Sequence, residues 1–185
     1  MKEWTCMATP NKWLYCPKTT ARHPMSEQYR NCLELLDDIT QNESDKKVKT
    51  PFLSEVALNL DAVEKASTRV KNKATMDAAF GISKNEGKSG QFALCEYRLN
   101  YKSVNKISKS GLDAKIKGSS ELLGGEIPIY KPYLFVFNSS IKASAISKLR
   151  RFSANKAIYR ALDIQDLYDD FFKIDGATTF GKTHK

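Results

Sequence analysis

The fold is decided by three consecutive segments, KATMDAAFGI (73–82), SKNEGKSG (83–90) and QFALCEYRLNYK (91–102). Apolar and polar residues alternate through the first and third segments, which is typical of β-strands, whereas the second segment is polar and contains glycine. We therefore predict two antiparallel strands joined by a loop. Each strand carries one carboxylate that its pattern does not explain as core, Asp77 in the first and Glu96 in the second.

The expected register of this hairpin brings the two carboxylates together. If the strands are symmetric about the loop from Ser83 to Gly90, Asp77 lies directly opposite Glu96. The β-carbons of such cross-strand neighbours are about 4.5–5.5 Å apart, so the two charges repel unless a cation lies between them. Mg²⁺ prefers oxygen ligands and is commonly held by one or two carboxylates. We therefore predict that Asp77 and Glu96 bind Mg²⁺.

Arg98 follows Glu96 on the same face of the second strand. It lies about 6.6 Å further along the strand, close enough to reach a phosphate bound at the same ion. The alternatives are a hairpin whose carboxylates face solvent and a surface ion pair between Glu96 and Arg98.

Length and charge limit the class of protein. A chain of 185 residues forms one domain of ordinary size. Its 30 basic and 21 acidic residues give a net charge of +9, which favours a polyanionic partner such as nucleic acid. The N-terminal residues lack the apolar run of a signal peptide, and no window resembles a membrane span. We expect a soluble, cytoplasmic protein with no membrane partner.

The four cysteines are too few and too irregularly spaced for a disulfide framework, so we expect reduced thiols. Cys6, Cys16, His23 and Cys32 could supply four zinc ligands by residue type, but no closely spaced Cys or His pair defines a geometry.

The rest of the chain predicts an α/β fold, a small mixed sheet flanked by helices. We expect an N-terminal arm and helix packed on the core (1–50), the core itself (51–175) and a tail (176–185). Within these limits the predicted elements are helices over 27–41 and 51–65, a helix or loop over 105–117, an apolar strand over 132–138, a helix beginning at Ser139 or Ser140, and a final helix over 155–173.

The helix predicted over 51–65 carries one further candidate residue. Glu64 lies at the edge of the apolar stripe of this helix, whereas Glu55 lies nearly opposite the stripe. Glu64 is therefore the carboxylate that we expect to face the sheet. The alternative is an exposed Glu64 that pairs with Lys65 or Lys71.

The carboxylate hairpin, with a helix before it and an apolar strand and helix after it, resembles the PD-(D/E)xK nuclease superfamily. The matching residues are Asp77 in MDAAF and Glu96 and Arg98 in CEYR. The region from about 51 to 172 follows the α-β-β-β-α-β order of that family if one short strand escapes detection. The chain departs from the family pattern at Met76, where the family has proline, and at Arg98, where it has lysine. Arginine stabilises phosphate charge but does not lose a proton near neutral pH.

More narrowly, the chain is similar to the small cleavage subunit of a heterodimeric type IIS restriction endonuclease. This resemblance implies a Mg²⁺-dependent endonuclease with a restriction-endonuclease-like core. It would cut one strand of double-stranded DNA when docked to a large DNA-recognising subunit. The resemblance implies that Asp77 and Glu96 hold Mg²⁺, that Arg98 stabilises the transition state, and that Glu64 orients water or a second metal.

Two other functions fit the same sequence. One is a non-catalytic basic module that binds nucleic acid or scaffolds a complex, with Lys148, Arg150 and Arg151 on its contact face. The other is a structural protein without a nucleic-acid role.

Overall fold

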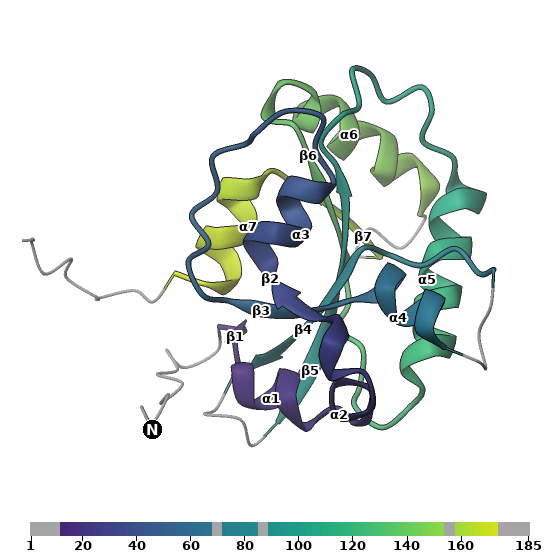
Figure 1. Ribbon diagram of the computed structural model, residues 1–185. Coiled ribbons are helices and arrows are strands. Elements are labelled where there is room, and N and C mark those ends of the chain that lie inside the picture. The colour runs from purple at the N-terminus through teal and green to yellow at the C-terminus, as the bar shows by residue number, and fades with distance from the viewer. Residues whose placement is uncertain (1–11, 68–71, 85–88, 154–157, 174–185) are drawn as a thin grey trace, which may run out of the picture.

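A seven-stranded mixed sheet forms the centre of the molecule (Figure 1). The computed structural model describes residues 12–67, 72–84, 89–153 and 158–173. The strands lie in the order β2-β3-β4-β5-β6-β7, and β1 pairs with β4 outside this path. Pairing is antiparallel from β2 to β5 and parallel from β5 to β7. The predicted α/β class with a small mixed sheet flanked by helices is therefore confirmed.

After the N-terminal helices, strands and helices alternate along the chain, except that β4 and β5 follow one another directly. Their bounds are β1 Leu14–Tyr15, α1 Pro17–Arg22, α2 Pro24–Gln28, η1 Arg30–Cys32, β2 Leu33–Leu35, α3 Leu36–Asn42, β3 Val56–Asn59, α4 Leu60–Ala66, β4 Ala78–Ser83, β5 Gly90–Arg98, α5 Lys109–Leu123, β6 Tyr133–Phe137, α6 Ser139–Phe152, β7 Tyr159–Leu162 and α7 Ile164–Phe171. None of the helices in these described parts of the chain is long and apolar enough to cross a membrane.

The hairpin of β4 and β5 has the register that the sequence predicts. Ser83 pairs with Gly90, and the ladder continues to Ala78 opposite Cys95. Asp77 directly precedes β4, so the same register places it level with Glu96. The predicted strand over 132–138 and the helix after it are also present, as β6 and α6.

The predictions for three helices are wrong in part, because short strands interrupt them. The segment 27–41 contains β2, the segment 51–65 contains β3, and the segment 155–173 contains β7. Short apolar runs such as those in β3 and β7 satisfy helix and strand patterns equally well, and pairing with a neighbouring strand decides between them. The helices α4 and α7 then begin immediately after β3 and β7, at the side-chain caps Asn59 and Asp163.

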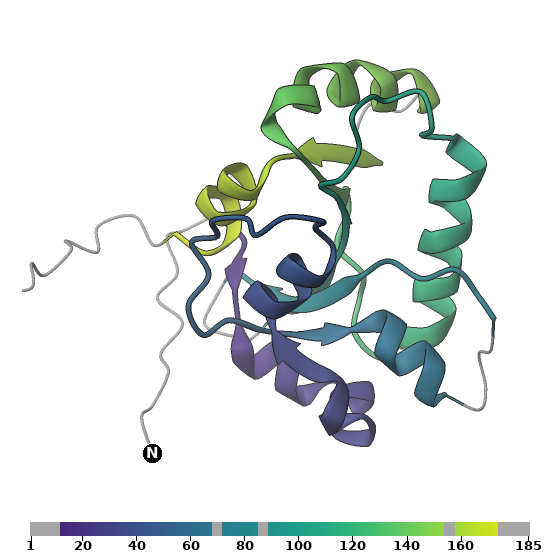
Figure 2. The ribbon, with the colours of Figure 1, turned by 45° about the horizontal axis from the view of Figure 1, so that its top comes forward.

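Helices lie against both faces of the sheet (Figure 2), and two apolar layers fill the space between helices and sheet. One layer lies under α4, α5 and α6 and includes Val63, Leu112, Ile116 and Leu149. The other lies under α3 and α7 and includes Ile39, Phe80, Leu167 and Phe171. Because β5 and β6 lie at the middle of this sandwich, the polar residues at the carboxyl end of β5 are held by rigid, buried strands.

The helix α5 packs so closely against the segment that precedes β4 that position 118 of the helix requires glycine. A β-carbon on Gly118 would lie 2.1 Å from the backbone carbonyl oxygen of Ala74, so the helix would have to move. We expect Gly118→Ala to lower the free energy of unfolding by about 1–3 kcal/mol through overpacking, as measured by urea denaturation. Gly125→Ala is the control, because no atom lies within 4 Å of its added β-carbon. Equal stability of the two variants would contradict this packing.

Candidate active site

Asp77 and Glu96 are buried carboxylates rather than surface charges. Their exposed fractions are only 3% and 1%. Asp77 Oδ2 accepts a hydrogen bond from the backbone N–H of Tyr97 at 2.5 Å, which ties the two strands together at this point. The backbone carbonyl of Asp77 accepts from Leu60 N–H at 3.0 Å, which joins the site to the start of α4. The alternative of a hairpin with solvent-facing carboxylates is therefore wrong.

Lys115 of α5 is the cation that both carboxylates share. Its Nζ lies 2.8 Å from Glu96 Oε1 and 3.5 Å from Asp77 Oδ1. Ser119, one turn later in α5, holds the helix in place by accepting from Met76 N–H and donating to the carbonyl of Lys115. The helix is thus anchored directly beside Asp77.

No role was predicted for Lys115 from the sequence, although the helical spacing of its neighbours indicates one. Leu112, Lys115 and Ile116 share one helical stripe, and the two apolar residues of that stripe are buried in the core. A lysine within an apolar stripe needs a buried partner. The segment 105–117 was predicted as either a helix or a loop, and Lys115 shares a stripe with Leu112 and Ile116 only if the segment is a helix.

Arg98 holds Glu96 from the other side. Its Nη2 lies 2.7 Å from Glu96 Oε1, and its Nη1 donates to the hydroxyl of Tyr101 at 2.8 Å. The guanidinium carbon also lies 5.1 Å from the centre of the Tyr101 ring, within the range of a cation–π contact. The Glu96–Arg98 ion pair considered as an alternative is present, but its carboxylate is buried.

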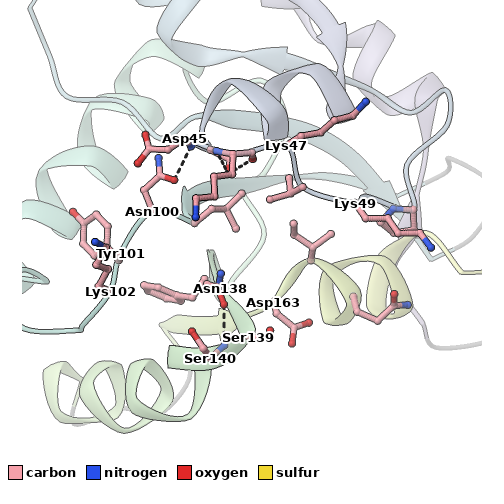
Figure 3. A pocket seen from close by; sticks show the side chains of 18 residues that line it. Asp45, Lys47, Lys49, Asn100, Tyr101, Lys102, Asn138, Ser139, Ser140 and Asp163 are labelled. Carbon is pink, nitrogen blue, oxygen red and sulfur yellow. Dashed lines mark hydrogen bonds between the residues drawn. The ribbon is translucent and has the colours of Figure 1, made fainter.

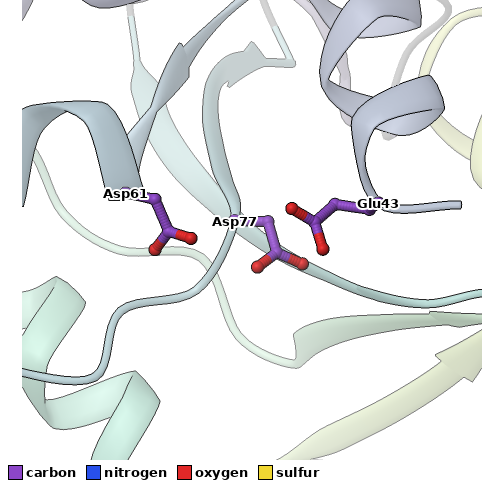
Figure 4. A group of neighbouring side chains, drawn as sticks. All are labelled: Glu43, Asp61 and Asp77. Carbon is purple, nitrogen blue, oxygen red and sulfur yellow. The ribbon is translucent and has the colours of Figure 1, made fainter.

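Asp77 also belongs to a group of three acidic residues that could hold a metal ion. Ligand oxygens of Glu43, Asp61 and Asp77 all lie within 4.8 Å of one another. Figure 4 shows Asp77 between the other two, with the three carboxylates converging. Glu43 comes from the end of α3 and Asp61 from the first turn of α4. The Asp61 side chain is held by the hydroxyl of Thr75 at 2.6 Å.

Glu64 lies outside this group, and Asp61 is the residue that α4 contributes to it. Because α4 begins at Leu60, Asp61 occupies its first turn. The carboxylate of Glu64 accepts a hydrogen bond from the backbone N–H of Lys73 at 3.3 Å. Glu55 lies before β3, where its carboxylate accepts from the backbone of Leu53 and Ser54.

Across the described ranges of the chain, the acidic triad is the one group of three or more potential metal ligands. Cys16, His23 and Cys32 therefore do not gather into a zinc site there, and Cys6 lies outside the described residues. Nothing in the sequence marked Glu43 or Asp61, because acidic residues are ordinary in polar loops and in the first turn of a helix.

Burial and crowding of like charges make these carboxylates hold protons more tightly than usual. Burial, with the added charge of Asp77, raises the pKa of Glu96 to about 8, against the opposing effect of Lys115 and Arg98. Burial also raises the pKa of Asp77 and, together with the charges of Asp77 and Asp61, that of Glu43. Burial lowers the pKa of Lys115, but Glu96 and Asp77 outweigh it and the net shift is upward.

When its carboxyl groups are ionised, the site carries more negative than positive charge. Four carboxylates, those of Glu43, Asp61, Asp77 and Glu96, face two cations, Lys115 and Arg98. A divalent cation would balance this excess, and carboxylate oxygens are the ligands that hard cations prefer. Fold and site together define an α/β protein with a buried acidic cluster suited to a metal ion. No family model, curated protein or solved structure matches the chain.

Proposed function

We propose that the chain is a Mg²⁺-dependent DNA endonuclease subunit that hydrolyses a phosphodiester in one strand of a duplex. In this proposal it acts when docked to a large DNA-recognising subunit. The observation that carries the proposal is the position of Asp77, which belongs to the acidic triad and also contacts Lys115, the partner of Glu96. A metal-ion position thus lies directly beside a fixed cation, as cleavage of a phosphodiester requires.

The order of elements also supports this proposal. From α3 to β6 the chain runs α3, β3, α4, β4, β5, α5 and β6, with β3, β4 and β5 antiparallel and β6 parallel to β5. This differs from the α-β-β-β-α-β order that the resemblance to the PD-(D/E)xK superfamily implies by the additional helix α4 between β3 and β4, and β3 would be the short strand that escaped detection. The first helix of the series is α3 rather than the one expected over 51–65.

Each residue of the site has a proposed task. Asp77 would hold Mg²⁺ with Glu43 and Asp61. Glu96 lies outside this triad, where Lys115 and Arg98 hold its carboxylate, so it would reach the ion only as a further ligand. When bound, Mg²⁺ would polarise the scissile phosphate and lower the pKa of a water molecule. Arg98 would donate hydrogen bonds to phosphate oxygens and stabilise the charge that develops on them.

Lys115 takes the place of the lysine that the family pattern has at position 98. Because the carboxylates raise its pKa, its ammonium group is protonated and acts as a donor rather than a base. It would hold a phosphate oxygen or the attacking water beside Asp77 and Glu96. Glu64 would orient water only from outside the triad, through its position on α4.

Metal binding is expected to strengthen as pH rises. The pKa values of Glu43, Asp77 and Glu96 are raised in the folded chain, so protons compete with the ion as pH falls. Without metal, deprotonation of these groups makes the folded chain less stable as pH rises from about 5 to about 8. We expect Mg²⁺ to raise the melting temperature more at about pH 8 than at about pH 6.

The control for this measurement uses two isosteric changes in acidic residues. Asp61→Asn should weaken the Mg²⁺-induced rise in melting temperature strongly, because it removes one ligand of the triad. Asp38→Asn should leave the rise unchanged, because Asp38 is an exposed residue of α3 outside the triad. A melting temperature that does not change on addition of Mg²⁺ at either pH would contradict the metal site.

The function itself is tested with the chain in its natural assembly. The tagged chain is isolated from its own cells together with the proteins that it binds, and is incubated with supercoiled plasmid DNA. We expect nicking that requires Mg²⁺ and stops on chelation. Absence of Mg²⁺-dependent cleavage by this assembly would overturn the proposal.

The second candidate function, a non-catalytic basic module, has weaker support. Arg150 and Arg151 lie in the last turn of α6, where cations stabilise the helix dipole. Lys148 lies over the ring of Phe152. Interactions within α6 therefore explain the positions of these three basic residues without a nucleic-acid partner. Salt-sensitive DNA binding that depends neither on Mg²⁺ nor on the buried carboxylates, without cleavage, would favour this alternative.

A further inference from the structure

A second concave site lies next to the buried carboxylates. Its cavity, with a volume of about 750 Å³, is formed by the loop before β3, the end of β5 and the starts of α6 and α7 (Figure 3). This places it at the carboxyl ends of β5, β6 and β7, where parallel strands of α/β proteins commonly bind ligands. Its volume is within the range of small-molecule pockets.

The rim of this cavity is strongly basic. Lys46, Lys47, Lys49 and Lys102 line it, and all four are exposed. Among the described residues none of these lysines has a carboxylate partner, in contrast to Lys115 and Lys142. Two carboxylates also line the cavity, Asp45 and Asp163, and Asp163 is paired with Lys142. The four lysines outnumber them, and this excess of cations favours a polyanionic ligand.

The opposite side of the cavity adds neutral donors and a favourable dipole. Asn138, Ser139 and Ser140 form the start of α6, on the opposite side of the cavity from Lys47 and Lys49, whose amino groups point outward in Figure 3. This helix has 14 residues and no acidic residue in its first turn, so the positive end of its dipole stays uncompensated. An anion inside the cavity would be attracted from both sides.

The floor of the cavity is apolar, unlike its rim. Leu99 and Phe137 are buried there, and Val48 and Ile164 are partly buried beside them. Such a floor suits the flat face of a nucleobase, whereas a phosphate alone would gain nothing from it. A base inside a duplex is stacked and cannot reach this floor, so the nucleotide would have to be unpaired.

Two hydrogen-bonded residues join the cavity to the carboxylate cluster. The Asn100 side chain donates to the carbonyl of Glu43 at 3.3 Å and accepts from Asp45 N–H at 2.7 Å. Tyr101 accepts from Arg98, which holds Glu96. A nucleic-acid strand that passes the carboxylates therefore meets the cavity directly beyond them.

We infer that this cavity binds an unpaired nucleotide of the DNA strand that passes the carboxylate cluster. The base lies on the apolar floor, and the neighbouring phosphates lie on Lys46, Lys47, Lys49 and Lys102. This inference rests on the proposed function for the identity of the strand, and it assigns the nucleic-acid contact to the cavity rather than to Lys148, Arg150 and Arg151 of α6.

The test measures binding without cleavage. The chain carries Asp77→Asn, a chelator removes divalent ions, and the probe is a fluorescein-labelled single-stranded dT oligonucleotide followed by fluorescence anisotropy. One variant adds Lys46→Ala, Lys49→Ala and Lys102→Ala. Its matched control adds Lys148→Ala, Arg150→Ala and Arg151→Ala, which removes the same amount of charge from α6.

We expect the cavity variant to bind the probe at least about tenfold more weakly and the α6 variant to bind within about twofold of its parent. Removing three phosphate contacts should also lower the slope of log affinity against log salt by about 2, at about 0.7 per contact for single strands. The single strand should bind more tightly than its duplex with dA. Equal losses in the two variants, no binding of the single strand, or tighter binding of the duplex would each overturn the inference.

Failure of this inference is distinguishable from failure of the proposed function. If the natural assembly nicks DNA with Mg²⁺ and the lysines of the cavity make no difference, the proposed nuclease function stands and nucleotide binding in the cavity is rejected. If the probe binds through these lysines but the assembly shows no Mg²⁺-dependent cleavage, nucleotide binding in the cavity stands and the proposed nuclease function is rejected. Thermal melting of both triple variants serves as the folding control.

Discussion

Asp77→Asn is expected to lower strand cleavage by about 10³-fold or more while leaving the chain folded. The substitution removes the charge of the one carboxylate that belongs to both the acidic triad and the Lys115 contact. Electrostatic and metal contacts of this kind account for losses of this size. The asparagine oxygen still accepts from Tyr97 N–H, so the link between β4 and β5 remains.

Although Asp77→Asn lowers cleavage, it is not expected to lower the stability of the folded chain. Burial and the charge of Asp61 raise the pKa of Asp77, which means that its charged form is disfavoured in the folded chain. Removing that charge should therefore keep or raise the melting temperature of the metal-free chain at about pH 8. Nicking activity, circular dichroism and thermal melting on one preparation measure both effects.

The control for Asp77→Asn is Asp38→Asn on the exposed side of α3, which should keep full activity. Cleavage that persists in Asp77→Asn would reject the site. A loss of cleavage together with a loss of folded structure would reject the claim that Asp77 acts in catalysis rather than in folding.

Lys115→Met is expected to lower cleavage by about 10²–10³-fold, because the donor beside the scissile phosphate is lost. It should also destabilise the metal-free chain, since Asp77 and Glu96 lose their shared cation. Breaking a buried pair by removing one partner costs about 3–5 kcal/mol. We expect about 2–3 kcal/mol, because Lys115 is partly exposed and the carboxyl groups take up protons in response.

This stability loss should depend on pH and metal in a way that a packing defect would not. At about pH 6 Glu96 is largely protonated, so losing Lys115 costs less than at about pH 8. Mg²⁺ should restore part of the lost stability but not the cleavage. Urea denaturation at both pH values, with and without Mg²⁺, measures this pattern.

Lys117→Met is the matched control on the same helix. Lys117 is exposed, and its ion pair with Glu121 at 3.9 Å is a surface contact that contributes little. We expect unchanged cleavage and a change in stability within about 0.5 kcal/mol. An equal effect of the two substitutions would show that Lys115 has no special task.

Local sequence patterns were sufficient to predict the centre of the molecule. The alternation of period two in β4 and β5 and the polar loop between them determine the register, since a shift by one residue would turn the apolar side chains away from the core. That register places Asp77 level with Glu96. The apolar run of β6 identified a buried central strand by the same logic.

Only the tertiary structure decided the rest of the site. The segments of β2, β3 and β7 are short apolar runs, and hydrogen bonding to a neighbouring strand rather than local preference makes them strands. With β3 in the sheet, α4 begins at Leu60 and presents Asp61 to the site.

The residues that complete the site come from three separate elements. Glu43 directly follows α3, Asp61 lies on α4 and Lys115 on α5, and no spacing in the sequence relates them. Their meeting depends on the packing of α3 on one face of the sheet and of α4 and α5 on the other. The sequence by itself determined the two carboxylates that one hairpin brings together, because their separation depends on local register. Long-range packing determined which other charges surround them.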